Sequence, residues 1–177
     1  MAWKNGGGST REIAIWPPET GLDDFLWRVS LATLEVDGPF SVFEQIDRHI
    51  MLVEGRGVRL HSPDGRIDHL LTRPYQPFAF SGDVPIRGDL VAGPSVDLNV
   101  MGRRDSGAAD LRVATTSLDI EPALCGAVLC LAGRWRVDED DIAEGEGLRW
   151  LGEPCAPRLL ACQPDCAIAI ATWHPTE

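Results

Sequence analysis

The stretch DRHIMLVEG, residues 47–55, carries side chains that often do chemistry. It offers one imidazole, His49, and one carboxylate, Glu54, which are the groups used for metal binding and for general acid–base catalysis. A transition-metal site needs several such ligands pointing to one place. The histidines at positions 49, 61, 69 and 174 are scattered, and no His-x-His pair occurs. The sequence therefore predicts no metal and no other cofactor.

A second set of polar residues suits the recognition of an anion. Arg28 and Ser30 fall on one face of an alternating stretch, and Arg48 and Asn99 lie in two later stretches that also read as strands. An arginine binds a carboxylate through two parallel hydrogen bonds, and serine and asparagine add neutral ones. Inside a small β-barrel these four side chains would hold one small acid. The candidates for the mouth of such a pocket are Asn5, Arg11 and Arg103.

The same residues also have a purely structural interpretation. Arg28 could form a buried ion pair with Glu54 or Asp97 and bind no ligand at all. Alternation along a strand shows which residues share a face but not which face is inside. Both interpretations therefore stay open at this stage.

The glycine run in WKNGGGSTRE, residues 3–12, is a third candidate, in this case for a phosphate loop. No Gly-Lys-Ser/Thr closes it and no helical pattern follows, so that interpretation fails. Glycines allow a left-handed backbone and close backbone approach. The run is therefore interpreted as a glycine-built lip that leads into a strand.

The composition narrows the class of protein. A chain of 177 residues is long enough for one domain or for two small ones that share a core, and its net charge of −11 disfavours a nucleic-acid partner. The first ten residues lack the apolar stretch of a secretory signal, and the longest apolar run is too short to cross a bilayer. We expect a cytoplasmic protein without a membrane partner. The five cysteines have neither zinc-knuckle spacing nor a secretory context, and Cys125 and Cys130 are interpreted as small buried hydrophobes.

The elements that must position these residues read as strands almost throughout. Short apolar stretches alternate with Gly and Pro, and the clearest strand signals lie at residues 11–16, 25–36, 96–101, 126–137 and 166–173. Residues 49–60 are predicted to form a strand, a Gly turn and a second strand. Helical signal is confined to two possible turns at residues 17–24 and 138–143. A loose internal repeat aligns Gly55 with Gly133, each in a turn that reads Gly-Arg after an apolar strand. The chain is therefore predicted to be all-β and built from two similar modules.

Five ordered blocks identify a family resemblance. The blocks WKNGGGSTREI, FLWRVSLATLEVDGPFSVF, IDRHIMLVEGRGVRL, PFAFSGDVPI and DLNVMGRR together resemble the HutD/Ves family of double-barrel cupin proteins. The resemblance implies a bicupin of two double-stranded β-helix (jelly-roll) barrels. We assign residues 1–104 to the N-terminal module and residues 105–177 to a C-terminal cupin-like module, with exchange of strands between them allowed.

The chain departs from the family pattern in three places. Relatives usually carry a further strand before the Trp-Lys-Asn-Gly-Gly-Gly motif, so we expect the leading edge of one sheet to differ. Glu44-Gln45-Ile46 stands where relatives tend to have Pro-Gly, and Leu98 stands where an aromatic residue is commoner. We interpret these last two as tolerated drift.

The resemblance also sharpens the functional prediction. It implies a cytoplasmic protein that binds a small anionic metabolite, such as formylglutamate, in connection with histidine utilisation, and a homodimer is consistent with it. Two alternatives stay open. One is a cofactor-independent isomerase, hydrolase or lyase that uses Glu54 or His49, and the other is a protein-interaction module whose barrel is filled.

Overall fold

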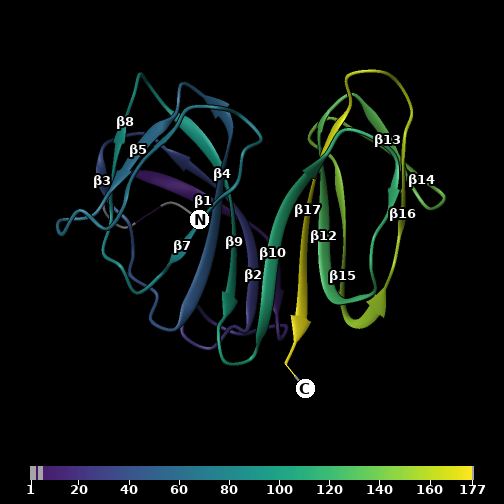
Figure 1. The fold of residues 1–177 in the computed structure, drawn as a ribbon, viewed down its shortest axis with the longest axis horizontal. Helices are drawn as coiled ribbons and strands as arrows, with labels where there is room; N and C mark the ends of the chain where they lie inside the picture. The colour runs from purple at the N-terminus through teal and green to yellow at the C-terminus, as the bar shows by residue number, and fades with distance from the viewer. Residues whose placement is uncertain (1–2, 4–5, 177) are drawn as a thin grey trace.

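A computed structural model describes residue 3 and residues 6–176 of the chain. These residues form strands and turns with no helix, so none of the described segments is a helix able to cross a membrane (Figure 1). The strands of the first half are β1 (Gly8–Trp16), β2 (Trp27–Leu34), β3 (Gly38–Pro39), β4 (Ile46–Gly55), β5 (Val58–His61), β6 (Asp68–Leu71), β7 (Phe78–Ser81), β8 (Arg87–Leu90) and β9 (Ser95–Arg103). The strands of the second half are β10 (Gly107–Ala114), β11 (Leu118–Asp119), β12 (Ala123–Ala132), β13 (Arg134–Val137), β14 (Asp140–Ala143), β15 (Gly147–Cys155), β16 (Arg158–Ala161) and β17 (Ala167–Pro175).

The strands form two pairs of antiparallel sheets. The first half makes a five-stranded sheet in the order β1-β2-β9-β4-β7 and a four-stranded sheet in the order β3-β8-β5-β6. The second half makes two four-stranded sheets, β10-β17-β12-β15 and β11-β16-β13-β14. Figure 1 shows the two halves side by side, with β2, β9 and β10 near their boundary. We call them the N-terminal barrel and the C-terminal barrel.

The predicted strands are all present. The predicted repeat is confirmed at the two glycines on which it was aligned. Gly55 and Gly133 both end a long strand with a left-handed backbone, at φ values of 99° and 76°. The two predicted helical turns are wrong. Residues 17–24 form a succession of turns, and residues 138–143 form a tight turn followed by β14. Asp138 takes a φ of 52°, which reverses the chain into the β13–β14 hairpin instead of continuing a helix.

Each barrel has its own interior, and the two interiors differ. The C-terminal barrel is filled by aliphatic and aromatic side chains, among them the fully buried Trp135 and Leu159. The N-terminal barrel has an apolar cluster that includes Ile50, Leu52 and Leu60. In addition, it buries the charged or polar side chains of Arg28, Ser30, Arg48, Asp97 and Asn99. Among the described residues, the N-terminal barrel is therefore the one that combines an apolar lining with the polar set that the sequence singled out.

A third apolar core lies between the barrels, where the two larger sheets face each other. Trp27, Val29 and Leu98 from the N-terminal barrel meet Leu111 and Trp173 from the C-terminal barrel. The strands β2 and β9, and the middle of β4 around Met51, therefore have both faces buried, one in the barrel and one in this shared core. The predicted alternation of β2 follows from this arrangement, since Trp27 and Val29 enter the shared core and Arg28, Ser30 and Ala32 enter the barrel.

Close packing in the C-terminal barrel generates the first prediction. A Cβ added at Gly126 on β12 would lie 2.0 Å from the Trp150 ring, and the Trp150 indole is fixed by a 2.9 Å hydrogen bond to the Ala123 carbonyl. Gly126→Ala should therefore lower the free energy of unfolding by about 1–3 kcal/mol in urea unfolding. Gly38→Ala on β3, where a Cβ meets nothing within 4 Å, is the matched control. Equal stability of the two variants would contradict this account.

Candidate functional site

The interior of the N-terminal barrel contains a cavity of about 450 Å³. Four of the side chains selected from the sequence line it together: Arg28, Ser30, Arg48 and Asn99. The rest of its lining is Trp3, Thr10, Leu22, Ala32, Pro39, Phe40, Ser41, Phe43 and Met101. The cavity therefore has one charged and hydrogen-bonding wall, and apolar side chains form most of the remainder.

The polar wall follows from strand register. In the antiparallel ladder, Ser30 on β2 is opposite Asn99 on β9, and Met101 on β9 lies between Arg28 on β2 and Arg48 on β4. Residues directly opposite in a ladder share a face of the sheet. Because β2, β9 and β4 are neighbours, side chains from three separate parts of the sequence converge on one patch inside the barrel.

Arg28 is held by an ion pair that the sequence did not indicate. Its Nε donates to the Glu12 carboxylate at 3.0 Å, and its Nη1 lies 3.4 Å from the Ser30 hydroxyl. The structural interpretation had paired Arg28 with Glu54 or Asp97, and that pairing is wrong. Glu54 is exposed beyond a β-bulge in β4, whereas β1 runs beside β2 and places Glu12 opposite Ser30.

Arg48 is the most unusual side chain in the site. It is 4% exposed, and its guanidinium lies over three phenylalanine rings, with Cζ 5.6 Å from the centroid of Phe40, 5.5 Å from Phe43 and 5.1 Å from Phe80. Its Nη2 donates to Asn99 Oδ1 at 3.0 Å and its Nη1 to the Ser41 carbonyl at 3.3 Å. Among the described residues no carboxylate pairs with it, and its Nε has no hydrogen-bond partner.

The aromatic rings around Arg48 come from separate parts of the chain. Phe40 follows β3, Phe43 lies in the next loop and Phe80 belongs to β7. Gly88 on β8 makes room for Phe40, because a Cβ there would lie 2.7 Å from the ring. No spacing in the sequence links these phenylalanines to Arg48, and only the closed barrel brings them together. They stabilise the buried cation through their ring faces but do not neutralise it.

The electrostatics of the cavity favour an anion. Burial, and then the charge of Arg28, lower the pKa of Arg48 to about 10, so the side chain remains protonated at neutral pH. Two guanidinium groups thus share the cavity wall, and only that of Arg28 is paired with a carboxylate among the described residues, the partly exposed Glu12 outside the cavity lining. The Arg48 charge is left without such a partner, in a protein whose net charge is −11.

Asp97 lies deeper in the same barrel and is the second polar group without a partner. It is fully buried between Ala32 and Leu52 on the neighbouring strands, and neither carboxylate oxygen accepts a hydrogen bond in the described part of the structure. Burial raises the pKa of Asp97 to about 7. A carboxyl group in this position is therefore neutral over most of the acidic range.

The three residues predicted at the mouth are not at this cavity. Asn5 lies outside the described residues. Arg11 points to the opposite face of β1, because it is opposite Leu31, which packs in the core between the barrels. Arg103 anchors the loop before β2 by donating to the carbonyls of Phe25 and Asp23. The lip is formed instead by Trp3, whose indole donates to Thr10 at 2.7 Å, so the WKNGGGSTRE block does reach the cavity but through other residues.

The two candidate acid–base residues also lie elsewhere. His49 faces away from Arg48, beside a surface hollow that includes Ala108 and Ala109, and burial lowers its pKa. Glu54 is exposed at the end of β4. Neither side chain lines the barrel cavity, and the described residues contain no cluster of three or more His, Cys, Asp or Glu side chains able to hold a metal.

The two-barrel architecture and a cavity within one barrel define the class of the protein as a cupin with two barrels. The fold is shared with a cupin 2 barrel protein from Leptotrichia buccalis, at a TM-score of 0.61 and 8% identity over 93% of this chain and 88% of the other. A much stronger likeness is to HutD from Pseudomonas fluorescens SBW25, in a structure from a formate condition, with a TM-score of 0.86 and 28% identity over 100% and 94% of the two chains.

Sequence comparison gives the family. The model of the HutD family matches residues 1–166, and the chain belongs to that family. The Protein Ves of Cronobacter sakazakii is 38% identical over 97% of this chain and 92% of its own length. The Protein Ves of Citrobacter koseri is 36% identical over 98% and 89%. The resemblance identified from the five sequence blocks is thus confirmed.

The buried carboxyl group generates a prediction about pH. Between pH 4 and pH 7 folded Asp97 keeps a proton that the unfolded chain has released, so the free energy of unfolding should fall as pH rises through this window. The effect is about 1.4 kcal/mol for each unit by which the folded and unfolded pKa values differ. Urea unfolding at pH 5 and pH 8 measures it. Asp97→Asn should remove this fall, so parallel pH profiles for wild type and variant would contradict the assignment.

Proposed function

We propose that the protein binds a small anionic metabolite inside the N-terminal barrel and acts as a binding protein. The observation that carries the proposal is the buried Arg48 guanidinium, which faces a cavity and has no carboxylate partner among the described residues. Removing a charge from water without a partner of opposite sign costs several kcal/mol. A ligand carboxylate would supply that partner and would accept hydrogen bonds from Arg48, with Arg28 and Ser30 beside it.

The shape of the site limits the size of the ligand. A cavity of about 450 Å³ falls in the range of sites for small molecules and excludes a folded partner. The Arg48 guanidinium is held by its hydrogen bonds to Asn99 and Ser41 and by its contacts with the phenylalanine rings. The cation is therefore oriented before a ligand binds. A short acid with one further polar group, such as N-formylglutamate, fits this combination of charge and volume.

The wider biological role belongs to the same proposal. The HutD resemblance supports a place in histidine utilisation, a cytoplasmic location and an acid of that pathway as ligand, and a homodimer is compatible with it. The alternative of an interaction module with a filled barrel is disfavoured by the cavity itself. The alternative of an enzyme using Glu54 or His49 is disfavoured because both side chains lie outside that cavity.

The substitution Arg48→Met tests the proposal through two opposite effects. Methionine keeps the apolar contacts with the phenylalanine rings and removes the unpaired charge, so the ligand-free variant should unfold at the same or a higher temperature than wild type. Its affinity for N-formylglutamate should fall at least about thirtyfold, since removing one partner of a buried charge pair costs about 2–5 kcal/mol. Titration calorimetry and thermal unfolding, each with and without the ligand, measure both effects.

Arg11→Gln is the matched control, because Arg11 is an arginine of the same five-stranded sheet that does not line the barrel cavity. This variant should retain the full affinity for N-formylglutamate. If no small dicarboxylic acid or N-acyl amino acid binds the wild type, or if Arg48→Met binds as tightly as wild type, the proposal fails.

A further inference from the structure

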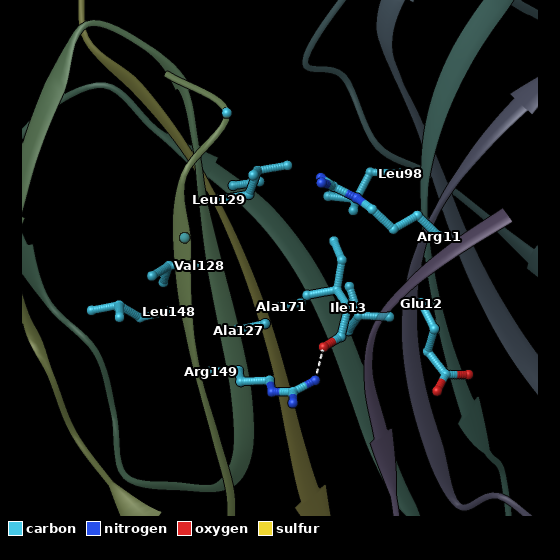
Figure 2. A pocket seen from close by; sticks show the side chains of 14 residues that line it. Arg11, Glu12, Ile13, Leu98, Ala127, Val128, Leu129, Leu148, Arg149 and Ala171 are labelled. Carbon is cyan, nitrogen blue, oxygen red and sulfur yellow. Dashed lines mark hydrogen bonds between the residues drawn. The ribbon is translucent and has the colours of Figure 1, made fainter. Parts of the chain in front are cut away.

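A second cavity, of about 330 Å³, lies in the shared core between the two barrels. Figure 2 shows it from close by, with β1 of the N-terminal barrel on one side and strands of the C-terminal barrel on the other. Its walls are Val29 and Leu98 from the N-terminal barrel, and Leu129 with a group of alanines from the C-terminal barrel. The two cavities have no lining residue in common. Strands β1, β2 and β9 lie between them and contribute different side chains to each.

The space exists because small side chains stand where the two sheets face each other. Ala127 on β12 is directly opposite Ala171 on β17, and Leu129 is opposite Ala169. These alanines belong to the same apolar core as Val29 and Leu98, and together they line the cavity. A water molecule occupies ~30 Å³ in the liquid. By this measure the cavity has room for about ten non-hydrogen atoms.

One end of this apolar space carries a guanidinium that is available to a ligand. Figure 2 shows the Arg11 side chain reaching from β1 toward Leu129, while Glu12 points away. Glu12 also belongs to the lining of this cavity, but its carboxylate is already paired with Arg28 at 3.0 Å. Beyond the backbone pairing of β1 with β2, the Arg11 guanidinium has no hydrogen bond or ion pair with any described residue. The nearby Arg149 on β15 differs, because it donates to the Ile13 carbonyl and so joins the two barrels.

We propose that this inter-barrel cavity is a second binding site, which takes a medium-chain aliphatic carboxylate. The hydrocarbon chain lies among the alanines and leucines, and the carboxylate pairs with Arg11 at the open end. A saturated acid of about eight carbons has about ten non-hydrogen atoms, which matches the space. The hydrocarbon part of the ligand has no polar group, so its burial against apolar walls leaves no hydrogen bond unmade. The Arg11 guanidinium can bind the carboxylate through two parallel hydrogen bonds. This site is independent of the proposed metabolite site.

Titration calorimetry with octanoate tests the proposal directly. Octanoate should bind the wild type, and 1-octanol, which has the same chain without the charge, should bind at least tenfold more weakly. Arg11→Gln should weaken octanoate binding at least tenfold, and Arg11→Lys should retain part of the affinity. Arg11 is exposed, so these substitutions leave the fold intact.

A cavity-filling variant locates the ligand. Ala169→Leu places a larger side chain in the alanine group and should abolish octanoate binding while leaving N-formylglutamate binding unchanged. Should that variant fail to fold, Arg11→Gln still decides the matter. Arg48→Met separates the two sites, since it should lose N-formylglutamate and keep octanoate. Absence of octanoate binding to wild type, unchanged binding by Arg11→Gln, or its loss in Arg48→Met would overturn the proposal.

Discussion

The burial of both faces of three strands is the constraint on which the rest of this structure depends. β2, β9 and β4 separate the interior of the N-terminal barrel from the core between the barrels. In the buried central parts of these strands, each side chain must therefore suit one interior or the other, and consecutive residues must suit opposite ones. On β9 this rule sends Asp97 and Asn99 into the barrel and Leu98 and Val100 into the shared core.

This constraint explains why the polar residues are concentrated and not scattered. A polar side chain on the shared-core face would have to leave its hydrogen bonds unmade between two sheets, which is costly. The same side chain on the barrel face meets a cavity and other polar groups. The barrel therefore collects Arg28, Arg48 and Asn99 on three adjacent strands, and the C-terminal barrel, which lacks such residues, closes over Trp135 and its aliphatic neighbours.

Strand alternation made the core of the site predictable, and its limits follow from the same physics. Arg28, Ser30, Arg48 and Asn99 lie on regular strands, where the period of two assigns each side chain to a face. Glu54 was misplaced because a β-bulge breaks that period, and a bulge has no signature in a single sequence. The phenylalanines around Arg48 and the ion pair with Glu12 depend on how loops and a neighbouring strand close the barrel, which alternation does not encode.

The β-bulge in β1 adds a different kind of information to the fold. Between Glu12 and Ala14 the register shifts by one residue, so that Ile13 and Ala14 both pack in the shared core. An unbroken strand that kept Ala14 in place would turn the side chains of Arg11 and Glu12 to the opposite faces of the sheet from the ones they occupy. Deleting Ile13 would remove only this extra residue, so Arg11 would stay opposite Leu31 and Glu12 opposite Ser30 in a regular strand. The bulge that absorbs Ile13, as much as the composition of β1, therefore sets which sign of charge each interior receives.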